Sequence, residues 1–336
     1  MQALVLQRAG ELAVAEVETP QPRRDDVLVR VRHSGICGTD LKIFTGAVPV
    51  TYPLIMGHEM AGDVVSGGDG LVTPGQRVLV DPVLFCGTCV DCRAGRTNLC
   101  ANGGIIGREV NGGFAEFVTA PRTHVHVLPD AIDTRSAPAI QVLTTCLHAQ
   151  RRAAVGSGQS VAVVGLGVSG QLHAQLARAR GAALVIGLSR SAWKRQVAER
   201  LGAHLTSSSG DAAVAAVRNA TGGHGADVVI ECTGHMKALA DAIAMVRPGG
   251  TIVLFGIYTD REAALPFYQL YFKEPTIVSA RAARPEDFPE SIALVAGGAI
   301  SISPLITHTV PVTQLREALA MLEDDVDGRM KIILEH

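Results

Sequence analysis

The segment VAVVGLGVSG, residues 161–170, constrains the fold of this chain more than any other stretch. Its first four residues are apolar and mostly β-branched, as in a buried strand, and the glycine pattern G-x-G-x-x-G leads into the helical stretch QLHAQLARARGA. A second apolar strand, ALVIGL, follows within about 30 residues. This β-α-β context predicts a dinucleotide-binding turn with the pyrophosphate over the helix N-terminus, and an ordinary tight turn is the alternative. The residues expected at this turn are Gly165, Gly167, Val168 and Gly170.

Later apolar runs continue the same pattern. ADVVIECTG at 226–234 and GGTIVLFGI at 249–257 are separated by helical stretches, which implies parallel pairing in a doubly wound α/β sheet. Such sheets bind ligands at the carboxyl ends of their strands. We therefore expect Thr233, Phe255 and Gly256, which lie at two strand ends, to contact the cofactor.

The residues after the second strand indicate which dinucleotide is bound. NAD-binding proteins normally place an Asp or Glu there, which accepts hydrogen bonds from the ribose 2′-hydroxyl. This chain has Ser189 and Arg190, with Lys194 and Arg195 one turn later. Because a carboxylate repels a 2′-phosphate whereas hydroxyl and guanidinium groups bind it, the sequence predicts that NADP is preferred over NAD. The alternative for the basic residues is a solvated helix start.

Four of the seven cysteines lie in CGTCVDCRAGRTNLC, residues 86–100. The loop is rich in turn-forming residues and has little apolar content, and four thiolates suit a tetrahedral zinc whose binding supplies folding energy. An iron–sulfur cluster and a redox pair are the alternatives. A closed site of this kind has no open coordination position, so we expect the chemistry elsewhere. The expected ligands of this structural zinc are Cys86, Cys89, Cys92 and Cys100.

A second set of metal-binding side chains occurs upstream, in GICGTD at 35–40 and GHEMAGDV at 57–64. Cys37, His58 and Glu59 offer sulfur, nitrogen and oxygen donors, which suit a zinc with one position left open. Each residue alone has a plainer interpretation, a buried apolar cysteine or a hydrogen-bonded His–Glu pair. The two glycine-framed motifs together favour a catalytic zinc.

These motifs and the four-cysteine loop, in this order and spacing, resemble the zinc-dependent medium-chain alcohol and polyol dehydrogenases, and match the sorbitol and threonine dehydrogenase branch best. The resemblance covers essentially all 336 residues. It implies that Cys37 and His58 bind the catalytic zinc, and that Glu59 is a third ligand or lies close to one. It also implies that Asp40 hydrogen-bonds the His58 ring, and that Thr39 passes the substrate proton outward, a turn-capping threonine being the alternative.

The resemblance also assigns three further positions of this chain to the active site or to its proton route. Thr145 is expected to line the nicotinamide side of the cleft. Gln141 stands where relatives commonly supply a glutamate or cysteine ligand, and since an amide is a poorer zinc ligand, we expect Gln141 to hydrogen-bond the zinc water or the substrate. Lys42 stands where many alcohol dehydrogenases place a proton-relaying histidine, so the proton from Thr39 is expected to take another route.

A chain of this length suits about two domains. The resemblance implies a GroES-like, β-rich catalytic domain over residues 1–148 and 281–336, which carries the catalytic zinc and the four-cysteine lobe, and a Rossmann cofactor domain over 149–280. The arrangement requires the metal to lie within hydride reach of the nicotinamide ring.

The composition and charge of the chain argue against nucleic-acid and membrane partners. The formal net charge is −2 and no basic cluster with interleaved aromatic residues appears, so we expect no nucleic-acid partner. The N-terminal segment lacks the pattern of a secretory signal, and no window of 18 residues is uninterruptedly apolar, so we expect no membrane span and a cytoplasmic location. The resemblance suggests a homodimer or homotetramer.

Together these observations predict a zinc-dependent oxidoreductase with two zinc ions per chain. It would transfer a hydride between NADP(H) and a small alcohol or polyol, or the matching ketone or aldehyde. An NAD-dependent sugar-alcohol dehydrogenase is one alternative. A non-catalytic zinc- and nucleotide-binding protein of the same fold is the other.

Overall fold

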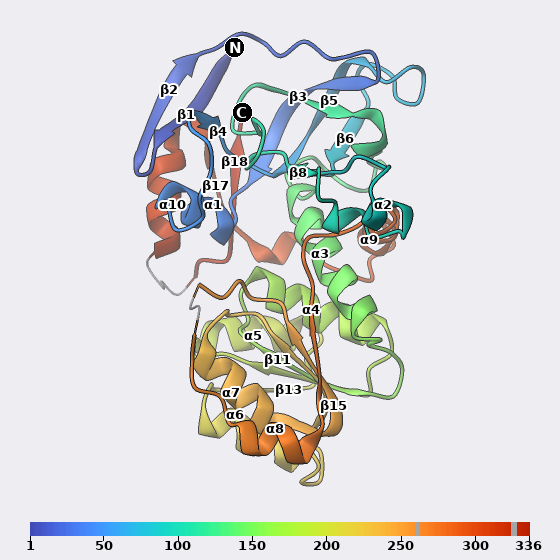
Figure 1. The fold of residues 1–336 in the computed structure, drawn as a ribbon, viewed down its shortest axis with the longest axis vertical. Helices are drawn as coiled ribbons and strands as arrows, with labels where there is room; N and C mark the ends of the chain where they lie inside the picture. Colours follow the sequence, from blue (N-terminus) through green and yellow to red (C-terminus); the bar gives the residue numbers. More distant parts are fainter. Residues whose placement is uncertain (260–261, 324–327) are drawn as a thin grey trace. The chain divides into compact units, whose positions relative to one another are not determined.

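The contacts within the computed structural model divide the chain into two compact units (Figure 1). The structure describes residues 1–259, 262–323 and 328–336. Unit 1 comprises Met1–Val142, Ala282–Gly297 and Ile302–His336. Unit 2 comprises Leu143–Arg281 and Gly298–Ser301. The division into a catalytic domain and a cofactor domain with boundaries at residues 148 and 281, which the family resemblance implies, remains a prediction.

Unit 1 is organised around a mostly antiparallel sheet. Within the described residues this seven-stranded sheet has the order β10-β6-β5-β3-β18-β17, and β9 also pairs with β3. The pairing of β18 with β3, which sets Ile333 opposite Gly35, places the end of the chain beside its N-terminal third. The bounds are β3 (Asp26–Gly35), β5 (Glu59–Gly67), β6 (Arg77–Val80), β9 (Phe117–Pro121), β10 (Val125–Val127), β17 (Ile306–Pro311) and β18 (Lys331–Glu335).

Smaller elements complete unit 1. Strands β2, β1 and β4 form one small sheet and β7 pairs with β8. Alternating residues of the strands fill apolar cores, such as the cluster of Val27, Val29 and Val31 from β3. The remaining bounds are β1 (Gln2–Arg8), β2 (Glu11–Glu16), β4 (Leu54–Ile55), β7 (Val83–Leu84), β8 (Gly104–Ile105), α1 (Gly38–Phe44), α2 (Val90–Arg93), α9 (Asp287–Ala296) and α10 (Leu315–Glu323). Helix α3 (Pro138–Arg152) contains the first change of unit.

Unit 2 is the parallel, doubly wound sheet that the sequence predicts. Within the described residues its order is β13-β12-β11-β14-β15-β16, and every neighbouring pair is parallel. Val161 and Val163 of β11 enter one apolar core and Ala162 and Val164 enter another, so this strand is buried on both faces. The strands are β11 (Ser160–Val164), β12 (Leu184–Leu188), β13 (Leu205–Ser207), β14 (Ala226–Glu231), β15 (Val246–Leu254) and β16 (Thr276–Ser279). The helices are α4 (Val168–Ala179), α5 (Ala192–Arg200), α6 (Asp211–Ala220), α7 (Met236–Met245) and α8 (Phe267–Lys273).

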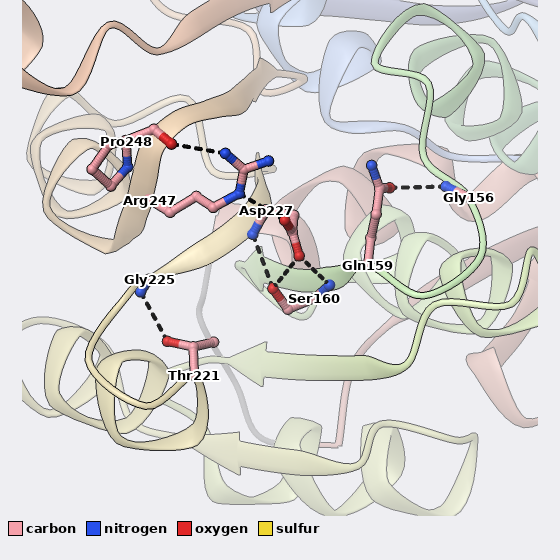
Figure 2. Close-up of polar contacts among 8 residues, drawn as sticks. All are labelled: Gly156, Gln159, Ser160, Thr221, Gly225, Asp227, Arg247 and Pro248. Atoms are coloured by element: carbon pink, nitrogen blue, oxygen red, sulfur yellow. Dashed lines mark hydrogen bonds and ion pairs between the residues drawn. The ribbon is translucent and has the colours of Figure 1, made fainter.

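A polar network ties strands together at the amino edge of this sheet, the edge opposite the glycine motif (Figure 2). The Asp227 carboxylate accepts hydrogen bonds from Ser160 N at 2.8 Å, Ser160 Oγ at 2.7 Å and Arg247 Nε at 2.7 Å. Nearby, Thr221 Oγ1 accepts a bond from Gly225 N at 2.9 Å. The bonds of Asp227 link the amino ends of β11, β14 and β15.

The described helices are short. The 15 residues of α3 make it the longest of them, and none of those in the described ranges has both the length and the apolar character needed to span a membrane.

Candidate functional site

The first candidate metal group lies at the start of α1 in unit 1. Cys37 is the residue before the helix, and its backbone N–H donates to Asp40 Oδ2 at 2.8 Å. The other Asp40 oxygen lies 3.2 Å from His58 Nδ1. One buried carboxylate therefore holds the cysteine turn and lies beside the imidazole ring.

The electrostatic environment of this group favours a cation. Burial lowers the pKa of His58, but the Asp40 carboxylate, and then Cys37, outweigh burial and hold the pKa well above its ordinary value. Cys37, His58 and Glu59 each offer one donor atom, and these atoms all lie within 4.8 Å of one another. Converging sulfur, nitrogen and oxygen donors in a negative environment fit a zinc ion.

Glu59 has a partner that sequence reasoning missed. Lys331, the first residue of β18, donates from Nζ to Glu59 Oε2 and, at 3.0 Å, to the carbonyl oxygen of Ile36. The side chains of Lys331 and Glu59 are only 2% and 1% exposed. Glu59 Oε1 is buried and has no hydrogen-bond partner among the described residues, so a metal ion is the kind of partner it lacks.

Gly35 makes room for this ion pair. A Cβ atom at position 35 would lie 2.8 Å from Lys331 Cε and 2.9 Å from Lys331 Nζ. The glycine that opens the motif GICGTD is thus required by close packing against a side chain from the last strand. A lysine that begins an apolar strand, KIILE, is the only sequence signal for this contact.

The other expected residues of the catalytic group lie on two helices. Thr39, in the first turn of α1, accepts a hydrogen bond from Cys37 Sγ at 3.7 Å. Gln141 is buried on α3. Thr145 is half-buried one turn further along the same helix, so both side chains lie on one helical face.

The four cysteines of the loop converge as a second group. Their sulfur atoms all lie within 4.8 Å of one another. Backbone N–H groups donate to three of the sulfurs: Cys86 N to Cys100 Sγ at 3.3 Å, Cys89 N to Cys86 Sγ at 3.3 Å, and Cys92 N to Cys89 Sγ at 3.5 Å. Hydrogen bonds from Thr88, first from its backbone, lower the pKa of Cys86 to about 5, whereas burial raises that of Cys92 to about 12. Four converging sulfur atoms, three of which accept N–H hydrogen bonds that favour the thiolate form, fit a structural zinc.

The glycine motif lies where a dinucleotide phosphate needs it. β11 ends at Val164 and α4 begins at Val168, so the motif is the turn between them. Gly165 has φ +91°, and a Cβ at Gly170 would lie 2.8 Å from the carbonyl carbon of Gly165, so neither position accepts a side chain. A Cβ at Gly167 would meet nothing within 4 Å, which leaves the N-terminus of α4 open to an anion.

The residues expected at the cofactor ribose form the loop between β12 and α5. Ser189 is buried and Arg190 is exposed. Ser191 caps α5 by accepting a bond from Lys194 N at 3.3 Å. Arg195 Nη1 donates to Ser189 O at 2.6 Å and to Arg190 O at 3.0 Å, so this guanidinium braces the loop.

The remaining residues that we expect at the cofactor lie around a buried carboxylate, Glu231, which the sequence analysis did not single out. Glu231 ends β14, Thr233 and Gly234 follow it, and Phe255 and Gly256 follow β15. The sequence signal for this buried carboxylate is an acidic residue at the end of an otherwise mostly apolar strand, ADVVIE.

Comparison with known proteins identifies the family. A model of the alcohol dehydrogenase GroES-like domain matches residues 23–130, and a model of the zinc-binding dehydrogenase domain matches residues 169–297. The L-galactonate-5-dehydrogenase of Escherichia coli K12 is 35% identical over 99% of this chain and 97% of its own length. This chain belongs to the zinc-dependent medium-chain alcohol and polyol dehydrogenases. The expected family, the GroES-like and Rossmann folds, and the assignment as an NAD(P)-dependent zinc alcohol dehydrogenase are confirmed.

Solved structures of the family agree in fold and differ in bound cofactor. A putative zinc-binding dehydrogenase from Sinorhizobium meliloti 1021, bound to NADP, is 34% identical with a TM-score of 0.93, covering 100% of this chain and 99% of that one. An alcohol dehydrogenase from Escherichia coli CFT073, complexed with NADH, is 27% identical with a TM-score of 0.93 and the same coverage. The dehydrogenase thus uses zinc and a nicotinamide cofactor.

Proposed function

We propose that this dehydrogenase interconverts a polyol or sugar-acid secondary alcohol and its ketone, with NADP(H) as the preferred cofactor. The observation that carries the proposal is the convergence of Cys37, His58 and Glu59. The name of the L-galactonate relative supports a hydroxylated substrate. Initial rates with a panel of polyols, sugar acids and simple secondary alcohols test it. Turnover confined to simple alcohols would refute the substrate class.

The zinc and the cofactor have separate tasks in this proposal. Zinc held by Cys37, His58 and Glu59 would polarise the substrate oxygen, and the nicotinamide would exchange a hydride with the substrate carbon. Asp40 fixes the His58 ring, and Lys331 holds Glu59 in place. The Thr39 hydroxyl accepts the substrate proton and hands it outward, and Gln141 hydrogen-bonds the substrate or a water molecule. A route that bypasses Lys42 predicts an unchanged pH–rate profile in Lys42→Ala.

We propose two zinc ions per chain, the second held by the four cysteines. Metal analysis of the protein and of single variants tests this. Cys37→Ser would lose the catalytic ion and turnover, whereas Cys100→Ser would lose the structural ion. Iron in place of zinc, or no change of metal content in Cys100→Ser, would refute the structural site.

The preference for NADP rests on Ser189 and Arg190, because a carboxylate at this loop would repel the 2′-phosphate. The NADP complex of the Sinorhizobium protein supports it. In an Arg190→Ala variant, kcat/KM with NADPH should fall by roughly tenfold while that with NADH changes little. A higher kcat/KM of the unmodified protein with NADH would refute the preference.

An NAD-dependent sugar-alcohol dehydrogenase is the second candidate. The observation in its favour is that Arg195 donates to the two loop carbonyls, so that fewer of its donors remain for a 2′-phosphate. The same kinetic comparison of the two cofactors decides between the candidates.

We also propose that this dehydrogenase forms a homodimer, alone or within a tetramer. Helix α8 exposes four aromatic side chains, and the neighbouring β16 is an edge strand whose Ile277 is 43% exposed. Such an edge suits pairing with a second copy. The aromatic residues are Phe267, Tyr268, Tyr271 and Phe272. A monomer in analytical ultracentrifugation, or a dimer unchanged by Tyr271→Glu, would refute this surface.

A further inference from the structure

The carboxylate of Glu231 is buried at the carboxyl edge of unit 2 and is held by donors alone. Thr233 N donates to it at 2.6 Å, Gly234 N at 2.9 Å and Tyr258 Oη at 2.6 Å, and Thr233 Oγ1 donates as well. Glu231 is 0% exposed, and none of the described lysines or arginines forms an ion pair with it. Four donors select a side chain that only accepts, because the amide of a glutamine would direct its own N–H groups at them.

Glu231 also anchors the end of the next strand. Its backbone carbonyl accepts hydrogen bonds from Phe255 N and Gly256 N, both at 2.9 Å. Tyr258, two residues after Gly256, donates to its carboxylate. Burial raises the pKa of Tyr258 and the hydrogen bond to Glu231 raises it further, so the phenol remains a donor. One residue therefore holds the turns that follow both β14 and β15.

These two turns are packed backbone against backbone, and the glycine motif lies against the Thr233 side chain. A Cβ at Gly234, which has φ +72°, would lie 2.9 Å from Ile257 C, and a Cβ at Gly256 would lie 2.7 Å from Gly234 Cα. A Cβ at Gly165 would lie 2.5 Å from Thr233 Cγ2. The three segments thus form one continuous floor at the carboxyl edge. A shift of the Thr233 turn would disturb first the turn after β15, which packs on it backbone against backbone.

The strand order assigns the turns after β14 and β15 to one half of the cofactor. The order β13-β12-β11-β14-β15-β16 reverses direction between β11 and β14, which is the switch point over which a dinucleotide lies. In this fold the pyrophosphate would lie at the N-terminus of α4, and the loop of Ser189 after β12 would face the adenosine ribose. The opposite half, nicotinamide and its ribose, falls on the side of β14 and β15.

We propose that Glu231 is a positioning residue for the nicotinamide half of the cofactor, and that Tyr258 is its partner in this role. The inference rests on the proposed cofactor function. Glu231 acts through the turns at Thr233 and Gly256, which it holds in the conformation that accepts the ring and its ribose. A loss of Glu231 should therefore weaken binding of the whole dinucleotide and leave binding of the adenosine half unchanged.

Calorimetric titration of the zinc-loaded protein with NADPH and with 2′,5′-ADP, and in parallel with NADH and 5′-AMP, tests this split. In Glu231→Gln the Kd for the dinucleotide should rise roughly tenfold or more, the effect of a lost charged hydrogen bond, while the Kd for the adenosine fragment stays within about twofold. Asp227→Asn is the matched control, because Asp227 is a multiply bonded carboxylate of the same strand at the opposite edge. It should leave both affinities unchanged.

Equal weakening of fragment and dinucleotide in Glu231→Gln, or no weakening of either, would overturn the inference. If Glu231→Gln does not fold, Tyr258→Phe decides the matter, since it removes one donor and keeps the carboxylate and its backbone bonds. Tyr258→Phe should weaken the dinucleotide severalfold, again without affecting the fragment. Failure of the unmodified protein to bind either dinucleotide would instead refute the proposed function.

Discussion

Replacing Lys331 with methionine tests the buried ion pair beside the candidate catalytic metal. Methionine keeps an unbranched side chain that is one atom shorter and removes its charge. The change leaves the Glu59 carboxylate and the Ile36 carbonyl oxygen without the ammonium donor that now bonds both. Because the Lys331 and Glu59 side chains are 2% and 1% exposed, water cannot replace that donor. Removing one partner of a buried pair costs about 3–5 kcal/mol, a large part of the roughly 5–15 kcal/mol that stabilises a domain.

A second substitution separates the charge effect from lost packing. Glu59→Gln removes the uncompensated charge, so the double variant Lys331→Met, Glu59→Gln should regain much of the stability that Lys331→Met loses. The double-mutant cycle should give a coupling energy of about 2–3 kcal/mol. A zinc ion bound by Glu59, as proposed, would supply positive charge to its carboxylate, so the loss in Lys331→Met should be smaller in the zinc-loaded protein than in the metal-free protein.

The assay must report on unit 1. The single tryptophan, Trp193, lies on α5 of unit 2, so its fluorescence follows the other unit. Urea dependence of hydrogen exchange in peptides from β3, β5 and β18 reports on the right strands. A loss below about 0.5 kcal/mol in Lys331→Met, or additive effects in the double variant, would show that the pair does not stabilise this site.

Three further outcomes follow from the structure. Cys92→Ser should lower the zinc content by one of the two ions proposed for the two groups, read by metal analysis, and full retention would contradict the four-thiolate site. Burial, and then the Asp287 carboxylate, raise the pKa of Asp81 to about 7, above its unfolded value. The free energy of unfolding should therefore fall as pH rises towards and through 7, by on the order of 4 kcal/mol between pH 4 and pH 8. Denaturant titrations of Asp81→Asn should show a flatter pH dependence. Burial raises the pKa of Asp227, but the Ser160 and Arg247 donors outweigh it and lower the pKa, so its contribution is present at neutral pH and is lost as pH falls through the folded-state value. Asp227→Asn should therefore cost about 1–3 kcal/mol at pH 7 and little in acid, and an equal cost at both pH values would contradict the assignment.

The parts of this dehydrogenase that a few neighbouring residues encode were accessible from its sequence. The turn of the glycine motif, the N-terminus of α4 and the convergence of the four cysteines depend on backbone conformation over short spans, so spacing alone predicted them. The parallel sheet followed from alternating strands and helices, because strands buried on both faces have continuous apolar runs. Cys37 and His58 are about twenty residues apart in the sequence, and the family resemblance was needed to predict that they bind the same metal ion.

The tertiary structure alone decided which polar residues are buried together. Lys331 and Glu59 are 272 residues apart in the chain, and only the pairing of β18 with β3 and of β3 with β5 brings them into contact. Glu231 is an acidic strand end in the sequence, and becomes a cofactor-positioning candidate only when two turns close over it. Local sequence specifies conformation within one element, whereas sheet order and register set the burial and the partners of each charge, and these depend on the whole fold.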